Sequence, residues 1–259
     1  MSLSEIQKKN IEETLSKCLR DKFANYNPEP ASMPFHTRLL GNDRLALFKF
    51  IQSLNTTFGT AIFEPVAITL AQDRFKIAQK QTFAGNKISV IAQTEIQKIM
   101  DGLITADNKP DKMREIEKIR KVCRKGEIRA VKPTKVDIYL KSKSGELYLI
   151  DIKTVKPNMG GFKEYKRTLL EWVGVALYDN PDANVNTLIA IPYNPYEPEP
   201  YNRWTMAGMI DLKNELKVAK EFWDFLGGEG AYETLLDCFE KVGIELRPEI
   251  DEYFSRFKN

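Results

Sequence analysis

The sequence predicts an α/β protein with a mixed β-sheet, a β-hairpin within that sheet, flanking helices and extra helices at both ends of the chain. Two observations predict this class. The first hundred residues carry apolar side chains at helical spacing, whereas residues 127–156 alternate and are rich in β-branched side chains, as strands are. The 259 residues, 42% hydrophobic and 29% charged, are enough to bury a core and exclude a disordered or fibrous chain.

Helices are expected in the N-terminal part of the chain. Apolar residues recur every three or four positions in the segments 4–20, 43–54, 63–75 and 86–99. Asp43 and Asn86 are candidate N-terminal caps of the second and fourth of these helices. Pro65 falls in the first turn of the third, where a proline costs no backbone hydrogen bond.

The periodicity changes after Gly126. The elements expected there are strands over 127–141 and 146–156, a helix over 162–178 and a short strand, buried on both faces, over 185–193. A proline-rich loop follows the last of these strands. Further helices make up the remainder, and Gly227-Gly228 separates two of them.

This order of elements divides the chain into an N-terminal helical region, 1–58, a core, 59–212, and a C-terminal helical region, 213–259. The length fits one large domain or two modest ones. No internal repeat or low-complexity segment marks a domain boundary, so the three regions are expected to form one compact unit.

Composition excludes several classes of protein. Cys18, Cys123 and Cys238 form no CxxC pair, so a disulfide framework is not expected and the thiols indicate the cytoplasm. The single histidine, His36, excludes chemistry that needs several imidazoles and is expected to be structural. The sequence also lacks a GxxxxGK[ST] loop, a GxGxxG motif after a strand, a signal peptide and an apolar run long enough for a membrane span.

Charge is unevenly distributed, although the formal net charge is only +3. Residues 109–143 contain thirteen Lys and Arg against five Asp and Glu, whereas residues 209–259 contain seven against twelve. A basic middle beside an acidic tail indicates one face that binds a polyanion. The alternative is an ordinary solvated helix face, which fits the helical spacing of residues 110–125 equally well.

The hairpin carries the residues that point to chemistry. Asp137 lies on its first strand, and Asp151 and Lys153 end its second strand, two residues apart and therefore on one face. A three-residue turn at 143–145 would place Asp137 opposite Asp151, with Cα atoms about 4.5–5.5 Å apart. Gly145 suits the left-handed position of such a turn. A four-residue turn would put Asp137 on the other face.

An acid two residues before a lysine is common by chance, so context must select the pair. The same spacing occurs at Asp107/Lys109, Glu164/Lys166, Asp211/Lys213 and Glu215/Lys217. Only Asp151/Lys153 both ends a strongly apolar strand and follows a strand that carries another acid. A surface hairpin with Asp–Lys pairs would not explain these polar side chains on the face that Leu147 and Leu149 mark as buried.

Two carboxylates this close repel each other unless a divalent cation lies between them. Oxygen ligands favour Mg²⁺, which keeps waters for a reaction. The candidate ligands are the carboxylates of Asp137 and Asp151 and the backbone carbonyl of Ile152. Lys153 is then positioned to orient an attacking water and to stabilise a pentavalent phosphate.

These residues resemble a known motif. Asp137 and Asp151-Ile152-Lys153, within PTKVDIYL and GELYLIDIKTVKPNMGGFKEYKRTLLEW, look like the PD-(D/E)xK motif of type II restriction endonucleases. The resemblance covers residues 59–258 and includes IPYNPYEPEPYNRW and EFWDFLGG. Within the family, the chain is similar to enzymes that cut short GC-rich palindromes of the GGNCC type. One departure is that Pro133 stands earlier than the proline of the motif.

The resemblance implies a restriction-endonuclease-like fold and a further acid. The family often adds a glutamate, from a helix before the first core strand, that holds a water on the metal or a second metal. Glu64, in FGTAIFEPVAITLA, is the first candidate because it follows a Gly–Thr helix start beside an apolar stripe. Glu95, in IAQTEIQKI, is the rival, and either residue is also explained as an ordinary exposed glutamate.

DNA contacts are expected from three segments. The candidates are Lys156 and Asn158 after the second hairpin strand, Lys163, Lys166 and Arg167 early on the next helix, and Asn194, Tyr196 and Arg203 in the proline-rich loop. Each of them alone is also explained as ordinary surface, and together they make a surface for a polyanion.

The implied activity is that of a Mg²⁺-dependent type II restriction endonuclease. It would hydrolyse double-stranded DNA at a short specific site and leave 5′-phosphate and 3′-hydroxyl ends. Cutting both strands of a palindrome implies a twofold homodimer, and restriction implies a cognate DNA methyltransferase in the same bacterium. Two alternatives stay open: a structure-specific repair or recombination nuclease with the same core, and a catalytically silent DNA-binding module.

Overall fold

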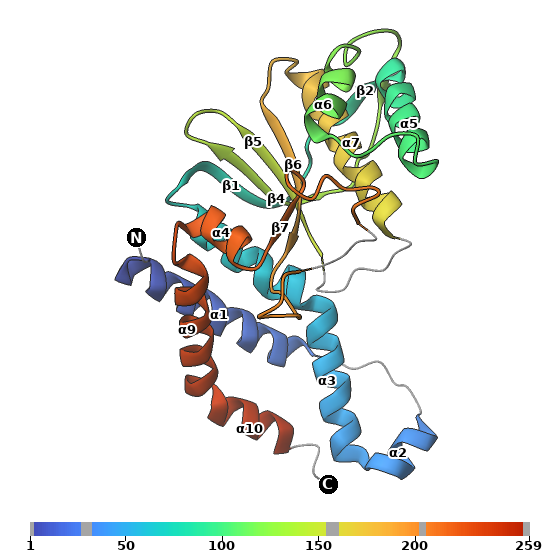
Figure 1. Ribbon diagram of the computed structural model, residues 1–259. Helices are drawn as coiled ribbons and strands as arrows, with labels where there is room; N and C mark the ends of the chain where they lie inside the picture. The colour runs from blue at the N-terminus through green and yellow to red at the C-terminus, as the bar shows by residue number, and fades with distance from the viewer. Residues whose placement is uncertain (1–2, 27–32, 154–160, 202–205, 256–259) are drawn as a thin grey trace.

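The computed structural model describes residues 3–26, 33–153, 161–201 and 206–255. Helices precede, interrupt and follow the strands (Figure 1). In chain order the elements are α1 (Glu5–Asn25), α2 (Pro34–Leu40), α3 (Asn42–Phe58), the π-helical turn η1 (Gly59–Phe63), α4 (Glu64–Ala71), β1 (Phe75–Thr82), β2 (Lys87–Ser89), α5 (Val90–Ile104), α6 (Lys112–Arg120), β3 (Ile128–Ala130), β4 (Val136–Ser142), β5 (Leu147–Ile152), α7 (Gly161–Asp179), β6 (Val185–Ile191), β7 (Leu216–Val218), α8 (Lys220–Gly227), α9 (Ala231–Glu245) and α10 (Arg247–Ser255).

A mixed sheet of five strands forms the centre of the molecule, in the order β1-β4-β5-β6-β7. β4 is antiparallel to both of its neighbours, β1 and β5, whereas β5, β6 and β7 run parallel to one another. β2 and β3 form a separate antiparallel pair. The prediction of an α/β protein with a mixed sheet and a hairpin within it is therefore confirmed.

Helices cover both faces of the sheet (Figure 1). α5, α6 and α7 bury one face around Leu149 and Ile189, and α1, α4, α8 and α9 bury the other around Ile138, Leu140 and Ile150. Successive residues of β5 thus enter different cores, as the period of a strand requires. Burial from both sides explains why β6 is almost uninterrupted in its apolar sequence.

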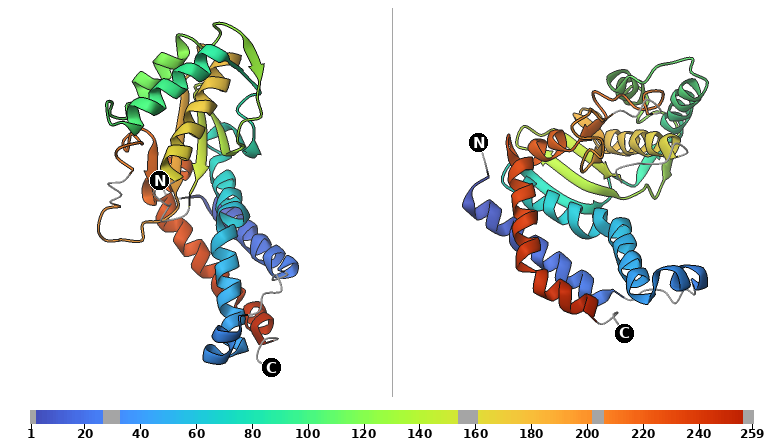
Figure 2. Two further views of the ribbon diagram at one scale, coloured as in Figure 1. Left: turned by 90° about the vertical axis from the view of Figure 1, so that its right-hand side faces the viewer. Right: turned by 60° about the horizontal axis from the view of Figure 1, so that its bottom comes forward.

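The helices from the two ends of the chain pack against each other. α1 lies alongside α9 and α4 (Figure 1, Figure 2). Ion pairs tie α1 to the C-terminal helices, from Lys241 to Glu12 at 2.6 Å and from Arg20 to Glu249 at 2.7 Å. The division at residues 58 and 212 stays a prediction. Within the described ranges, none of the helices is both long enough and apolar enough to cross a bilayer.

Two of the elements predicted from the sequence begin or end at other residues in the structure. The helix expected over 63–75 ends at Ala71, and Phe75 already begins β1, whose polar sequence is held by its pairing with β4. The single strand expected over 127–141 is two strands, β3 and β4. Pro133 lies between them, where it has no N–H to offer a ladder.

Two helix starts also differ. α3 begins at Asn42, so Asp43 lies in its first turn and does not cap it. Ser89 rather than Asn86 caps α5, since its Oγ accepts a hydrogen bond from the backbone N–H of Ala92 at 2.9 Å. The short elements α2 and β7 were not expected from the sequence.

Candidate active site

The β4–β5 hairpin has the register that a three-residue turn requires. Ile138 pairs with Ile150, and the backbone N–H of Ser142 donates to the carbonyl of Glu146 at 2.8 Å. Gly145 has a φ of 96°, a left-handed conformation that glycine adopts without steric cost. The predicted register of the hairpin is confirmed.

Asp137 and Asp151 lie at the same end of this hairpin. The Oδ2 atom of Asp137 accepts a hydrogen bond from the backbone N–H of Ile152 at 2.9 Å. This contact lies just beyond the last pair of the ladder, Ile138 with Ile150. Asp151 is only 6% exposed. The two carboxylates therefore meet where β4 begins and β5 ends.

Lys153 completes the group on the hairpin. Its Nζ lies 2.8 Å from Oδ2 of Asp151 and 4.5 Å from the ring centre of Tyr165, on α7. A cation over an aromatic face is attracted by the ring, so Tyr165 helps to hold the ammonium. The side chain of Lys153 is 25% exposed, which leaves this charge within reach of a ligand.

Glu64 reaches the same site from α4, on the other face of the sheet. It directly follows η1 and is 1% exposed. Nε2 of Gln81 donates to Oε1 of Glu64 at 2.9 Å and to Oδ1 of Asp137 at 3.1 Å, so a single amide links the two acids. Oε2 of Glu64 is buried and has no hydrogen-bond partner among the described residues.

Glu95, the alternative acid, lies on α5. This helix packs mainly on α7, α6 and β2. Glu64 shares a hydrogen-bond donor with Asp137, and its charge and that of Asp137 influence each other. The structure thus favours Glu64 over Glu95 as the additional acid.

Burial makes Asp151 and Glu64 hard to ionise. Desolvation raises the pKa of Asp151 from 3.8 to about 7, against the opposing charge of Lys153 and with the added repulsion of Asp137. Desolvation likewise raises the pKa of Glu64 from 4.5 to about 7, against the hydrogen bond from Gln81 and with repulsion from Asp137. The charge of Lys153 does not outweigh the burial of Asp151, so a bound cation would supply the further positive charge that these two carboxyl groups need in order to ionise.

The oxygen donors of the site fit Mg²⁺. In the described part of the chain, no cluster of three or more His, Cys, Asp or Glu side chains could hold a metal. Mg²⁺ does not need such a cluster, because it keeps several waters and takes one or two carboxylates. The carboxylates of Asp137 and Asp151, with the carbonyl of Ile152, are a donor set of this kind.

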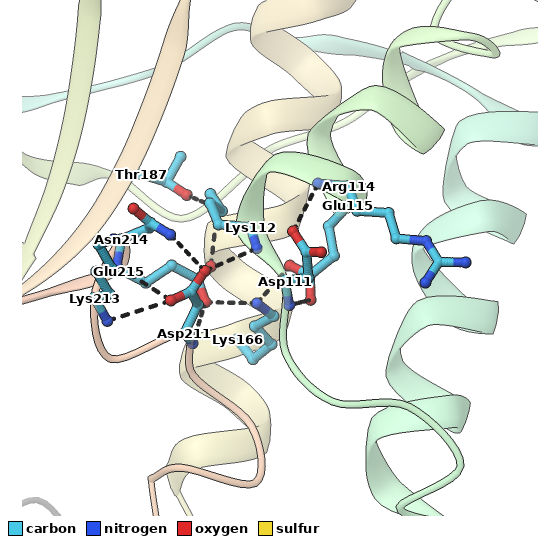
Figure 3. A network of polar contacts seen from close by, with 10 residues as sticks. All are labelled: Asp111, Lys112, Arg114, Glu115, Lys166, Thr187, Asp211, Lys213, Asn214 and Glu215. Atoms are coloured by element: carbon cyan, nitrogen blue, oxygen red, sulfur yellow. Dashed lines mark hydrogen bonds and ion pairs between the residues drawn. The ribbon is translucent and has the colours of Figure 1, made fainter.

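Lys166 is buried, so the prediction that it contacts DNA is wrong. Its side chain is 0% exposed, and its Nζ lies 2.5 Å from Oε2 of Glu115 and 2.6 Å from Oε2 of Glu215 (Figure 3). Lys112 joins the same network through Glu215, at 3.0 Å, and through the hydroxyl of Thr187. Position 166 belongs to the buried stripe of α7, which is why its ammonium faces protein and not solvent.

The network of Lys112, Glu115, Lys166 and Glu215 is balanced in charge. Burial alone would raise the pKa of Glu215, but the charges of Lys112 and Lys166 outweigh it and lower this pKa. Removing one member of a buried pair leaves an unpaired charge and costs about 3–5 kcal/mol. Lys166 and Glu215 belong to two other pairs with the acid–x–lysine spacing, Glu164/Lys166 and Glu215/Lys217. Their ion pair gives both residues a structural role in the core.

The other residues predicted to contact DNA lie on α7, in the proline-rich loop and outside the described residues. Lys163 is exposed in the first turn of α7, and Arg167 donates to Oε1 of Gln97 at 2.7 Å. In the proline-rich loop, Oδ1 of Asn194 accepts a hydrogen bond from the N–H of Tyr196 at 3.0 Å. The candidates outside the described residues are Lys156, Asn158 and Arg203.

Gln81 and Tyr165 are the residues of the site that the sequence did not indicate. Gln81 lies on β1, a strand of which only Phe75 had been assigned, to the end of a helix. Its position opposite Asp137 follows from the pairing of Lys80 with Ile138, which joins segments far apart in the chain. No local pattern indicated this strand, because apolar residues alternate with polar ones only at Phe75 and Ile77.

The restriction-endonuclease-like nucleases are the class of protein that combines such a sheet with acids gathered at the end of a central hairpin. Comparison with known families narrows this class. The family model described as type II restriction endonuclease, HinfI, matches residues 3–243. The chain belongs to this family, and its activity class is that of a site-specific deoxyribonuclease.

Curated relatives carry the same description. The type II restriction enzyme MjaII of Methanocaldococcus jannaschii is 26% identical, over 95% of this chain and 73% of its own length. The type II restriction enzyme HgiCII of Herpetosiphon aurantiacus is 24% identical, over 84% of this chain and 80% of its own. HgiEI, a type II restriction enzyme of the same organism, is 25% identical, over 85% of this chain and 80% of its own.

Proposed function

We propose that the hairpin site hydrolyses phosphodiester bonds of double-stranded DNA with Mg²⁺ as cofactor. The observation that carries this proposal is the meeting of Asp137 and Asp151 at one end of the hairpin, with Lys153 2.8 Å from Asp151. Asp151 and Glu64 are buried and have raised pKa values, which favours the binding of a dication, and Lys153 supplies a positive charge for a phosphate.

Each residue of the site then has a separate task. Mg²⁺, when bound, supplies Lewis acidity at the scissile phosphate and makes a water more acidic. Asp137, Asp151 and the carbonyl of Ile152 hold it. Lys153 orients the attacking water and offsets the charge that develops on the phosphate oxygens. Glu64, through Oε2, which has no partner among the residues that the structure describes, accepts a hydrogen bond from a water of the site.

The reaction is a hydrolysis that cleaves the bond between phosphorus and the 3′ oxygen. The water oxygen becomes part of a 5′-phosphate, and the leaving oxygen takes a proton to become a 3′-hydroxyl. These are the ends that the family resemblance implies. Lys153 is the cation of the site nearest to Asp151 and serves as the positive partner of the reacting phosphate.

DNA contacts are assigned to the exposed cations around the hairpin. Lys163 is exposed early on α7, and Lys132 and Lys135 are exposed just before β4 and therefore close to Asp137. Arg167, also on α7, is half-buried and would contact DNA with the part of its guanidinium that does not bond to Gln97. Lysine and arginine contacts to phosphate position the duplex without reading its sequence. Further candidates from the neighbouring segments are Lys156, Asn158, Asn194, Tyr196 and Arg203.

The biological unit that we propose is a twofold homodimer acting on a short GC-rich palindrome, since cutting both strands of a palindrome calls for two active sites. A cognate DNA methyltransferase would protect the DNA of the host. The three cysteines are free thiols, in keeping with action in the cytoplasm.

Sequencing the ends made from phage DNA tests activity and specificity together. With Mg²⁺ we expect discrete fragments with 5′-phosphate ends at one short palindrome, and with EDTA no cleavage. Asp151→Ala should abolish cleavage. Asp107→Ala is the matched control, since it removes the exposed acid of another acid–lysine pair and should cleave like the parent. Branch-dependent cutting would favour a repair nuclease, and a parent without metal-dependent cleavage would favour a silent DNA-binding module.

The dimer needs its own test. Sedimentation velocity with cognate DNA and Ca²⁺ should give two chains per duplex. A mixed dimer with one Asp151→Ala subunit should nick one strand of each site and leave the other intact. A single chain that cuts both strands would contradict the homodimer while leaving the catalytic site as proposed.

A further inference from the structure

Gln81 has a backbone conformation that its residue type rarely adopts. Its φ is 52°, in the left-handed region, where an L side chain approaches the neighbouring carbonyl too closely. Glycine avoids this contact, but position 81 is not a glycine. Such strained residues persist where the surrounding structure holds them, and they gather at functional sites. We therefore expect side-chain contacts of Gln81 that offset the cost of this backbone conformation.

The compensating contacts lead into the active site. The amide of Gln81 donates one N–H to Oε1 of Glu64 at 2.9 Å and the other to Oδ1 of Asp137 at 3.1 Å. Both acceptors are acids, and an amide nitrogen carries two hydrogens and no acceptor. The hydrogen-bond capacity of this nitrogen is therefore used completely by these two carboxyl groups.

The position of Gln81 in the sheet makes this bridge available. Lys80 pairs with Ile138 and Thr82 with Val136, so Gln81 stands directly opposite Asp137. A regular strand would direct the side chain toward the face that carries Tyr139. α4, which carries Glu64, packs on the opposite face, around Ile138. The left-handed φ changes the direction of the side chain. Its amide can therefore reach both Glu64, on helix α4, and Asp137, on strand β4 of the sheet.

We propose that Gln81 is a positioning residue, which holds Glu64 and Asp137 in the arrangement that Mg²⁺ requires before the ion and DNA arrive. This inference rests on the proposed function of the hairpin site. Gln81 does not touch the phosphate. It fixes two carboxylates relative to each other and leaves Oε2 of Glu64 without a protein partner among the described residues.

The chemistry of the side chain supports this role. Asparagine is one methylene shorter and cannot span the same two acids from the same backbone. Glutamate would bring a third carboxylate beside them, and lysine would place a positive charge where the dication belongs. Glutamine is the neutral side chain of this length that donates two hydrogen bonds from one atom.

The test separates the amide from the backbone. Gln81→Gly removes the amide and relieves the strain, whereas Gln81→Asn keeps an amide and a residue type that tolerates left-handed φ but shortens the reach. Gln79→Gly is the matched control, because Gln79 is an exposed glutamine on the same strand. Each protein is titrated with Mg²⁺ and Mn²⁺ without DNA, followed by melting temperature, and then assayed for cleavage.

The expected result for Gln81→Gly is a melting temperature in EDTA no lower than that of Gln79→Gly. The Mg²⁺ concentration for half-saturation should rise about 10–100-fold, as is usual when a group that orients a metal ligand is lost. Gln81→Asn should shift in the same direction. Gln79→Gly should keep the Mg²⁺ dependence of the parent, and Glu64→Gln combined with Gln81→Gly should cost less than the two separate losses multiplied together.

Unchanged half-saturation by Mg²⁺ in both Gln81 variants would overturn the proposal. A loss of folding in both, with Gln79→Gly folded, would also overturn it, because Gln81 would then serve the fold. A parent that is stabilised by Mg²⁺ but does not cut DNA would contradict only the proposed function, since the titrations without DNA still report on Gln81. A parent that is neither stabilised by the two metals nor able to cut would overturn both.

Discussion

The backbone N–H of Ile152 donates to Oδ2 of Asp137 across the hairpin at 2.9 Å. A side chain thus accepts a bond that in a regular ladder would go to main chain, at the point where the β4–β5 pairing ends. The same carboxylate is thereby oriented by its own sheet. A carboxylate fixed by backbone donors needs little reorganisation when it takes up a cation.

Asp137→Asn should separate the charge of this residue from its structural contact. The carbonyl oxygen of asparagine can still accept the N–H of Ile152, but its NH2 group then faces Nε2 of Gln81 and cannot accept from it. The protein should therefore stay folded, with a melting temperature lowered only by the loss of this one hydrogen bond. The cleavage rate should fall by more than about 100-fold, because a metal ligand is weakened. A single-turnover assay at saturating DNA measures this loss, with Asp107→Asn as control. Retained cleavage would remove Asp137 from the set of ligands.

The stability of the metal-free protein should fall as the pH rises from 5 to 8. The pKa values of Asp151 and Glu64 are raised to about 7 in the folded protein, from 3.8 and 4.5, so both groups bind protons more tightly when folded. This stabilisation is fully present below about pH 4 and is lost as the pH passes through 7. It amounts to roughly 3–4 kcal/mol for each of the two groups.

Urea unfolding in EDTA at several pH values measures this dependence, and Glu64→Gln should flatten it because an amide does not titrate. Mg²⁺ should stabilise the protein more at pH 8 than at pH 5.5, where protons compete for the same carboxylates. A free energy of unfolding that rises from pH 5 to 8 in EDTA would contradict the prediction.

Lys166→Met should destabilise the protein without altering catalysis by the folded fraction. The substitution leaves Glu115 and Glu215 buried without their shared ammonium, at 2.5 and 2.6 Å in the parent. The loss is expected to be about 3–5 kcal/mol, and urea unfolding measures it.

Lys163→Met is the matched control for Lys166→Met, because Lys163 is exposed on the same helix. We expect it to leave stability nearly unchanged and to weaken DNA binding, with a smaller salt dependence of the binding constant. The reverse pattern, with DNA binding lost in Lys166→Met and stability retained, would restore the prediction that Lys166 contacts DNA.

Gly145→Ala should destabilise the hairpin turn by about 1–2 kcal/mol, through its left-handed φ of 96° alone. A Cβ at Gly145 would meet nothing within 4 Å, so the change in stability reports the backbone conformation and not a steric clash. Gly243→Ala, in α9, also meets nothing within 4 Å and should be neutral or stabilising. Differential scanning calorimetry compares the two variants, and an equal effect of both would refute the turn assignment.

The sequence predicted the hairpin and its register because both depend on local features. Alternation defines the strands, and the glycine at position 145 selects the turn, so these two patterns alone bring Asp137, Asp151 and Lys153 together. These residues lie within seventeen positions of one another. Local patterns are sufficient over such a distance.

Contacts between distant segments could not be predicted in this way. Gln81 bonds to Glu64 and Asp137 across 17 and 56 positions, and its strand is polar and lacks β-branched side chains except at Ile77 and Thr82. Lys166 was misplaced for a related reason. A lysine on the buried face of a helix looks exposed in sequence until its partners, 51 and 49 positions away, are known.

The π-helical turn η1, Gly59–Phe63, has a consequence for how this family tolerates insertions. A turn of this kind amounts to one extra residue inside an otherwise α-helical run, here between α3 and α4. Deleting one of its five residues would convert it to α-helix with little rotation of α3 against Glu64, because the wider turn already accommodates the extra residue. A deletion within α3 itself would instead rotate the residues before it by about 100°, so a change of chain length by one residue is absorbed more easily at η1 than elsewhere in this helical run.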